Sequence, residues 1–285
     1  MKTAITGLRW LGRTFAIVLL VIVGSTILVR FAPGYLSDTR EMDGRYAAEA
    51  RSELSAEAAR SRSIHQMLLD EIKEAARGDF GTSRQFGIPV SELIKPRLAV
   101  SGGLLARGIG LAWLAALCAA LLSSAGRNPT MLRQAPATVL LAIPTAALAT
   151  FCLLADCGGP VLVMALLLAA RDFKFLDRAL RTAWREPHVL QARAQGIRTR
   201  RLLAAYIAPA LAPQLGALAS LSVVTALSAL VPVEVIFNVP GVGQLAWNAA
   251  LNRDLPVLLA VMMVMALAVT CSGMATPRAA EWESA

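Results

Sequence analysis

Residues 99–123 read AVSGGLLARGIGLAWLAALCAALLS, and a single charged side chain, Arg107, interrupts this apolar stretch. A helix needs about 20 apolar residues to cross the hydrocarbon core of a bilayer. Further runs satisfy this requirement in whole or in part, at residues 10–31, 134–155, 158–173, 211–237 and 256–274. We therefore expect an all-α integral membrane protein with six transmembrane helices.

The composition agrees with a membrane protein. Of the 285 residues, 56% are hydrophobic and 16% are charged, against about 25% charged residues in soluble domains. The net charge is +9 and the pI about 10.1, which alone would be compatible with nucleic-acid binding. The basic residues stand beside the apolar runs, so we attribute the charge to membrane topology and expect no nucleic-acid partner.

The distribution of charge predicts the orientation. Residues 33–98 contain ten Lys or Arg against eleven Asp or Glu, whereas residues 171–206 contain nine against three. Cytoplasmic loops are enriched in Lys and Arg. This places 171–206 and both chain termini in the cytoplasm of an inner-membrane protein, and 33–98 outside.

Four regions follow from this topology. Residues 1–32 form an N-terminal transmembrane helix, which we expect to be retained because no small-x-small cleavage site follows it. Residues 33–98 form an external segment that is rich in Ala, Glu, Arg and Leu, and hence helical. Residues 99–275 form the transmembrane core, and 276–285 a cytoplasmic tail.

The four cysteines show no metal-ligand spacing and are expected to behave as small hydrophobic residues. Cys152 and Cys157 fall near the outer face. Only a sharp turn between them would bring them together, so we predict that they stay unpaired.

Several motifs of catalysis are absent from the sequence. It contains no G-x-x-x-x-G-K-[ST] phosphate loop, no H-E-x-x-H and no G-x-S-x-G. We therefore expect no enzyme and no cofactor or metal in this chain. The acidic residues Asp156 and Glu234 fall near predicted helix ends, whereas Arg107 lies within a run. Arg107 either extends to the outer surface or faces the transport path or a partner.

The predicted cytoplasmic segment 188–209 reads HVLQARAQGIRTRRLLAAYIAP. Ala192, Ala194 and Gly196 are small residues within a basic stretch, and a short helix there would let another protein approach closely. Gly196 can end that helix with a positive φ angle. The alternative is a solvated loop that only obeys the positive-inside rule.

This segment resembles the coupling loop of ABC importer permeases, whose consensus is E-A-A, three residues, Gly, nine residues and I-x-L-P. Alignment on Gly196 places Pro209 at the consensus proline, and the dipeptide/oligopeptide branch has A-R-A-K-G where this chain has ARAQG. The resemblance implies an ATPase-coupling loop at 177–208 with the site residues Ala192, Arg193, Ala194, Gln195, Gly196 and Pro209.

Other blocks resemble the same branch in the same order. They are VRFAPG at 29–34, GDFGTS at 78–83, the Ile143-Pro144 pair, and VEVIFNVPGVG at 233–243 followed by RDLP at 253–256. The resemblance implies an outer-loop site made of Glu234, Phe237, Pro240, Gly241, Gly243, Arg253, Asp254 and Pro256. The chain departs from the family in its brief connection at 155–159 and in a short fourth helix.

The resemblance implies a type I importer. A second homologous permease subunit would complete the pore, two ATP-binding subunits would hold ATP and Mg, and an extracytoplasmic solute-binding protein would deliver substrate. Peptides are the leading substrates, with nickel chelates, glutathione and sugars still open. The alternatives are a stand-alone secondary transporter or channel, and a degenerate membrane scaffold that transports nothing.

Overall fold

The computed structural model describes residues 80–83, 85–125, 130–252 and 254–273, together with the isolated positions Gly12, Ala16, Leu20 and Gly24. These residues form helices, and the described part contains no strand beyond one isolated bridge between Thr82 and Pro89. Several predictions lie outside the described residues: the first transmembrane helix, the external segment to residue 79, the tail and Arg253.

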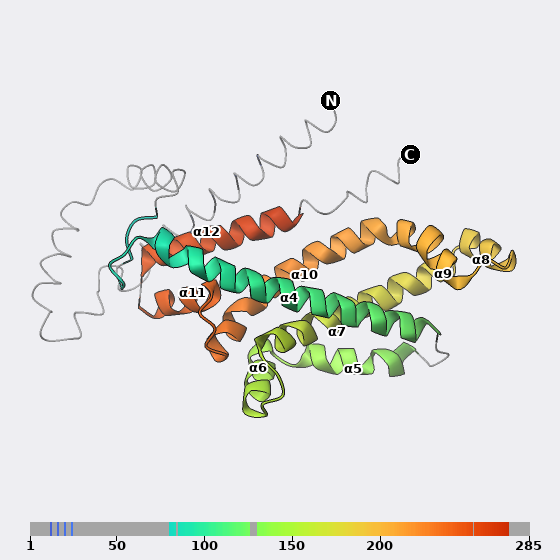
Figure 1. Cartoon of the computed structure of the whole chain (residues 1–285), viewed down its shortest axis with the longest axis horizontal. Coiled ribbons are helices and arrows are strands. Elements are labelled where there is room, and N and C mark those ends of the chain that lie inside the picture. Colours follow the sequence, from blue (N-terminus) through green and yellow to red (C-terminus); the bar gives the residue numbers. More distant parts are fainter. Residues whose placement is uncertain are drawn as a thin grey trace, which may run out of the picture. The chain divides into compact units, whose positions relative to one another are not determined.

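The helices follow one another as Figure 1 labels them. They are α4 (Val90–Ala125), α5 (Thr130–Ala142), α6 (Thr145–Leu154), α7 (Pro160–Trp184), α8 (Pro187–Ala194), α9 (Thr199–Leu202), a π-helical turn η2 (Leu203–Ile207), α10 (Ala208–Ile236), α11 (Val242–Leu251) and α12 (Leu255–Ser272).

Three continuous helices in the described part are long and apolar enough to cross a membrane: Val90–Ser123, Thr199–Ile236 and Leu255–Ser272. The predicted span 134–155 is instead a pair of helices, α5 and α6, which are bent by 96°. The break falls at Pro144, because proline disfavours a helical conformation at the residue before it and has no N–H to donate. The bent pair brings the candidate spans to four at most.

The prediction of a short fourth helix is wrong. Helix α7 has 25 residues, begins with Pro160 at its first turn and continues to Trp184. The apolar run ends at Ala170, but the helix does not, because Asp172 and Asp177 are buried and have hydrogen-bond partners inside the protein. Paired polar side chains allow a helix to pack against neighbours beyond its apolar stretch.

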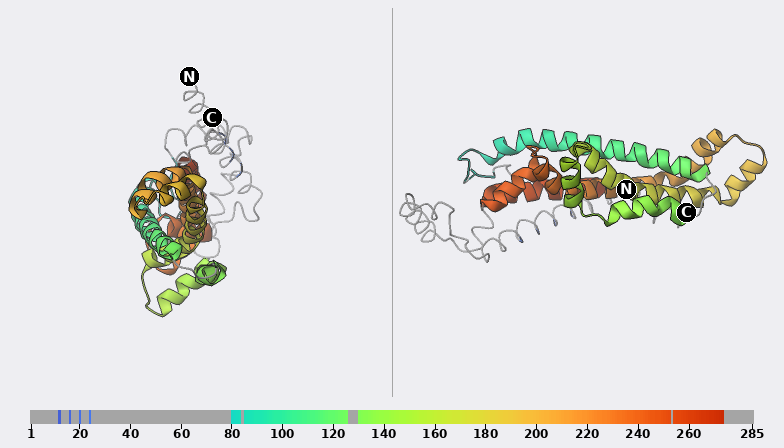
Figure 2. Two further views of the ribbon diagram at one scale, coloured as in Figure 1. Left: turned by 90° about the vertical axis from the view of Figure 1, so that its right-hand side faces the viewer. Right: turned by 90° about the horizontal axis from the view of Figure 1, so that it is seen from below.

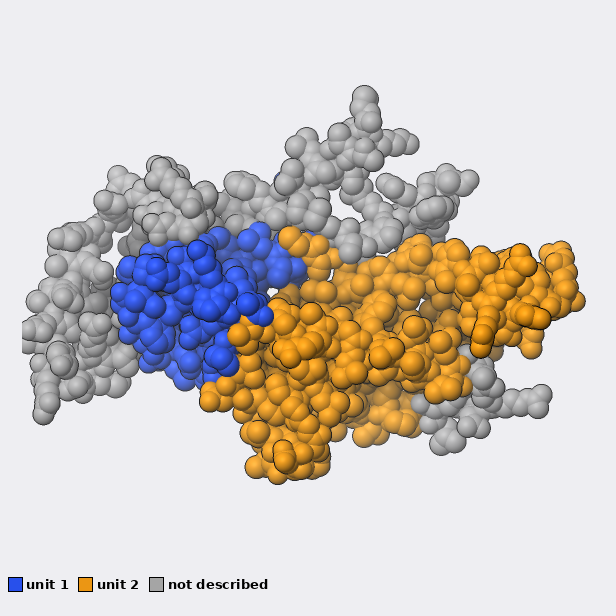
Figure 3. Space-filling model, in the orientation of Figure 1, with its two compact units in different colours: residues 1–99, 240–270 blue, residues 100–239, 271–285 orange. Residues whose placement is uncertain are grey.

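The described chain divides into two compact units, coloured separately in Figure 3. The unit of residues 100–239 and 271–285 contains α7 and α10, which run side by side in Figures 1 and 2, with α8 at their shared end. Its buried core includes Leu176, Leu180 and Leu218 with Ala116 and Ala120 of α4. Small residues such as these alanines let membrane helices approach closely.

The second unit consists of residues 1–99 and 240–270. Its core joins the start of α4 (Val90, Leu93, Ile94), α11 (Val242, Leu245, Ala249) and α12 (Val257, Ala260, Val261). Helix α11 begins at the end of the 233–243 block, at Val242. Apolar residues at helical spacing bury one of its faces, so packing stabilises this short helix.

Candidate functional site

Helix α8 and the turn after it form the segment that resembles a coupling loop. Gly196 has a φ of +76°, the N–H of Gly196 donates to the carbonyl of Arg193, and the N–H of Ile197 donates to that of Ala192. These two bonds around a left-handed residue define a Schellman cap. The prediction that Gly196 ends this helix with a positive φ angle is confirmed.

The small residues of α8 do not share one face. Val189 and Ala192 are buried, while Leu190, Arg193 and Ala194 are exposed. Residues three and four apart are neighbours on a helix surface, so Leu190, Arg193 and Ala194 form one outward face, which we call the α8 face. Leu190 is 50% exposed and is the large apolar side chain of this face.

Pro209 lies in the first turn of α10, directly after η2. In η2 the N–H of Ala208 donates to the carbonyl of Leu203, five residues earlier. A proline lacks the N–H that would continue the α-helical ladder, and its ring crowds the carbonyl four residues before it, which here is Ala205. The widened turn accommodates this ring, and such π-turns occur frequently at functional sites.

The outer-loop signature contains a second left-handed residue. Asn238 has a φ of +51°, and Val239 and Asn238 donate to the carbonyls of Glu234 and Val235. This Schellman cap ends α10. Of the predicted outer-loop residues, Gly241 is extended (φ −105°, ψ −172°) and caps the start of α11.

Glu234 and Phe237 lie at the end of α10, as the sequence predicted for Glu234. Glu234 is completely buried, and its Oε1 accepts a hydrogen bond of 2.6 Å from the hydroxyl of Ser101 on α4. A buried carboxylate needs such partners. Phe237 is half-buried and Pro240 exposed, while Gly241 and Gly243 are buried.

Asp254 connects two of the sequence blocks. The hydroxyl of Ser83 donates to Oδ2 of Asp254, and the backbone N–H of Gln85 donates to the same oxygen over 3.2 Å. Asp254 is completely buried, and its Oδ1 has no hydrogen-bond partner among the described residues. Its own carbonyl accepts from Leu258, so Asp254 begins α12, with Pro256 in the first turn, where proline is tolerated.

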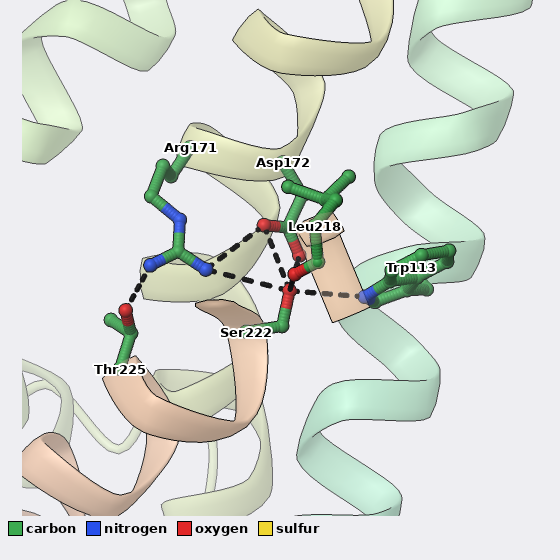
Figure 4. A network of polar contacts seen from close by, with 6 residues as sticks. All are labelled: Trp113, Arg171, Asp172, Leu218, Ser222 and Thr225. Carbon is green, nitrogen blue, oxygen red and sulfur yellow. Dashed lines mark hydrogen bonds and ion pairs between the residues drawn. The ribbon is translucent and has the colours of Figure 1, made fainter. Parts of the chain in front are cut away.

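A polar network connects helices within the unit of residues 100–239 and 271–285 (Figure 4). The sequence analysis did not predict it. The hydroxyl of Ser222 on α10 lies 3.0 and 3.1 Å from the carboxylate oxygens of Asp172 and 2.9 Å from the carbonyl of Leu218. It accepts from the indole N–H of Trp113 over 3.2 Å. The network thereby joins α4, α7 and α10.

Arg171 completes this network. Its guanidinium forms a 3.2 Å ion pair with Asp172, contacts Ser222 over 3.4 Å and donates to the hydroxyl of Thr225. The sequence placed Arg171 at the membrane boundary as a topology marker. A serine and a threonine at helical spacing in an apolar run were the available signal, since buried hydroxyls require a partner.

A second buried acid lies further along α7, beyond the predicted span 158–173. Asp177 is 1% exposed, and its carboxylate accepts from Arg181, Ser123 and Gln134. Burial favours the neutral acid, but the hydrogen bonds and the charge of Arg181 outweigh it and lower the pKa of Asp177 to about 2. This ionised carboxylate connects α4, α5 and α7.

The described residues contain no group of three or more His, Cys, Asp or Glu that could hold a metal ion. Apolar helices that are connected by buried polar and charged side chains are typical of an integral membrane protein.

The comparisons identify the class. The model of the family "binding-protein-dependent transport system inner membrane component" matches residues 108–282, so the chain belongs to this family. Members of this family are membrane permease components and not enzymes.

Two relatives are informative. A putative peptide permease protein of Brucella suis biovar 1 is 24% identical over 291 residues, which cover 91% of this chain and 90% of the relative. The metal-staphylopine import system permease protein CntB of Staphylococcus aureus is 31% identical over 108 residues, or 38% of this chain. The match spans 34% of the length of CntB.

Proposed function

We propose that this chain is one permease subunit of an ATP-driven importer and forms half of the translocation pore for peptides or similar small solutes. The observation that carries this proposal is α8 with its glycine cap at Gly196, set between α7 and the candidate span Thr199–Ile236. A rigid, capped helix transmits a displacement better than a loop does, because its end is held by two backbone hydrogen bonds.

The α8 face supports contact with an ATP-binding partner. Val189 and Ala192 anchor the helix to its own unit, whereas Leu190, Arg193 and Ala194 point away from it. An apolar side chain flanked by a cation and a small residue has the mixed character of a protein interface. ATP and Mg would bind to that partner, whose closure would be passed through α8 to α7 and α10.

The remaining assignments follow from the family and the charge distribution. A second homologous permease, two ATP-binding subunits and an extracytoplasmic binding protein complete the transporter, in an inner membrane with both termini in the cytoplasm. The two relatives are named for peptide and metal-staphylopine transport, so peptides and metal chelates are the substrates to compare. Residues 234–256 would line the outer mouth or contact the binding protein.

Affinity purification of the tagged chain from its native membrane in mild detergent tests this proposal. We expect a second permease and one or two ATPases to copurify. Reversal of charge on the α8 face by Arg193→Glu should remove the ATPases. The matched control is Arg178→Glu, the same reversal at an exposed position of α7, which should retain them.

Recovery of the wild-type chain alone, under conditions that preserve a control importer, would contradict the proposal. Transport without ATP would then identify a stand-alone transporter or channel, and no transport a degenerate scaffold. Of the two features that had suggested a scaffold, the short fourth helix is not found, since α7 extends to Trp184, whereas the brief connection between α6 and α7 is present.

A further inference from the structure

The turn between α6 and α7 brings two cysteines together. The N–H of Cys157 donates to the carbonyl of Cys152 over 3.1 Å, and that of Asp156 donates to Leu153 over 3.4 Å. Asp156 has a left-handed φ of +46°. These features define a third Schellman cap, in which Cys152 and Cys157 occupy the two positions whose side chains contact each other.

The backbone conformation directly after Cys157 is also restricted. Gly158 has a φ of +144°, and a Cβ added there would lie 2.3 Å from Cδ2 of Leu162 in the first turn of α7. Left-handed backbone therefore precedes Cys157 and a glycine-only conformation follows it. The sequence predicted unpaired cysteines because only a sharp turn could bring them together. The structure contains this turn.

The two thiols differ in access. Cys152 is buried, with 2% of its surface exposed, while Cys157 is exposed, and neither is in a disulfide. The Sγ of Cys157 lies 3.8 Å from the carbonyl oxygen of Cys152. Cys157 is the accessible thiol and Cys152 lies beside it as the resolving thiol, an arrangement typical of redox-sensitive cysteines.

The position of the turn favours oxidation. Composition does not place α7 among the candidate spans, but its 25 residues make it about 37 Å long, which exceeds the thickness of the hydrocarbon core, and its two aspartates are buried in the protein. The turn precedes α7, and the basic segment with α8 follows it. If that segment is cytoplasmic, as the proposed function requires, the turn lies on the outer side, where disulfides persist.

We propose that Cys152 and Cys157 are a redox pair that forms an internal disulfide and closes the end of α6. The Cys157 thiolate attacks a small-molecule or protein disulfide, forms a mixed disulfide and releases one donor thiol. The Cys152 thiolate then attacks the Cys157 sulfur and releases the second. Two protein thiols and one donor disulfide become one protein disulfide and two donor thiols, and the thiol protons pass to the departing thiolates.

The test uses the full chain in native membranes, with Cys118→Ser and Cys271→Ser removing the two other cysteines, which are exposed. Membranes are treated with oxidised glutathione, and intact-mass spectrometry distinguishes an internal disulfide from a glutathione adduct. We expect the internal disulfide, and two thiols that react with maleimide only after reduction. Two glutathione adducts, or two unmodified thiols, would overturn the proposal.

A control pair isolates the effect of the turn. Cys157→Ser combined with Leu154→Cys places the thiols two residues apart on one helix, where side chains do not face each other. The native pair should close about tenfold faster than this control, since orientation raises the effective concentration. Asp156→Gly should keep the fast rate and Asp156→Val should slow it, because a β-branched residue disfavours the left-handed conformation. Equal rates for all pairs would contradict the role of the cap.

A separate experiment tests the outer placement. An impermeant maleimide applied to intact cells should label Cys157 in the Cys152→Ser variant. Labelling that requires permeabilised cells would overturn the outer placement, and the proposed topology with it, while the rate comparison still decides whether the disulfide forms.

Discussion

Ser83 and Asp254 are 171 positions apart in the sequence, and the hydroxyl of Ser83 donates a hydrogen bond to the buried carboxylate of Asp254. The two residues belong to different sequence blocks, GDFGTS at 78–83 and RDLP at 253–256. The bond ties the entry of α4 to the start of α12 within one compact unit. A buried carboxylate is costly without donors, and the GDFGTS block supplies one of them through Ser83.

Ser83→Ala should destabilise the protein. The substitution removes one of the two donors to Oδ2 of Asp254, which is completely buried, and loss of a hydrogen bond to a charged group costs about 1–3 kcal/mol. Thermal unfolding in detergent measures the change, with Thr82→Ala, at the exposed neighbour, as the control. In a double-mutant cycle, Ser83→Ala should have little further effect on Asp254→Ala. Additive losses would show that the two side chains are not coupled.

Ser222→Ala should weaken the connection between α4, α7 and α10. Asp172 and the indole of Trp113 would each lose a partner, with a cost of about 1–3 kcal/mol. Ser228→Ala on the same helix is the matched control, because Ser228 is exposed and its hydroxyl donates to the carbonyl of Val224 on its own helix. Unfolding temperature and transport should both fall for Ser222→Ala and stay unchanged for Ser228→Ala. Similar values for the two variants would contradict the importance of this network.

Substitutions at Gly196 should separate backbone conformation from side-chain bulk. A Cβ at Gly196 would meet no atom within 4 Å, but the φ of +76° is unfavourable for residues with a side chain, by about 1–2 kcal/mol. Gly196→Asn should therefore retain ATP-dependent uptake, since Asn tolerates this conformation.

Gly196→Val, with its β-branched side chain, should abolish uptake while membrane insertion remains intact. Uptake is measured in vesicles and insertion by protease protection. Normal uptake by the valine variant would rule out a requirement for the glycine cap in coupling.

Asp177 should cause the free energy of unfolding to decrease at acid pH. Its folded pKa of about 2 lies below the unfolded value of about 3.9. A depressed pKa stabilises the folded state above the unfolded pKa, and this stabilisation is lost as pH falls through the folded pKa. The window is therefore pH 4 to 2, and the full effect is about 2 kcal/mol.

Unfolding temperature in acid-stable detergent, measured between pH 5 and 2, should fall less for Asp177→Asn than for the wild type. The control is Asp156→Asn, at an exposed position in the α6–α7 turn, which should leave the wild-type pH dependence in place. An unchanged slope for Asp177→Asn would assign the acid sensitivity to other carboxyl groups.

Several features were predictable because they depend on local chemistry. Long apolar runs predicted the helices α4, α10 and α12, since a helix is the only way for a single segment to satisfy its backbone in lipid. The spacing of Gly196 within a short basic segment predicted the end of α8. The ordered sequence blocks predicted the family, which the match over residues 108–282 confirms.

Other features depend on residues that are distant in the sequence, and only the tertiary structure decided them. The apolar run stops at Arg171 and Asp172, and the predicted span therefore ended at residue 173. Partners on α4, α5 and α10 bury Asp172 and Asp177, and α7 continues to Trp184. The helix α11 exists because α4 and α12 cover one of its faces. Hydropathy and helix propensity depend on a residue and its neighbours in the sequence. The free energy of burying a charge depends on the side chains that the fold places beside it.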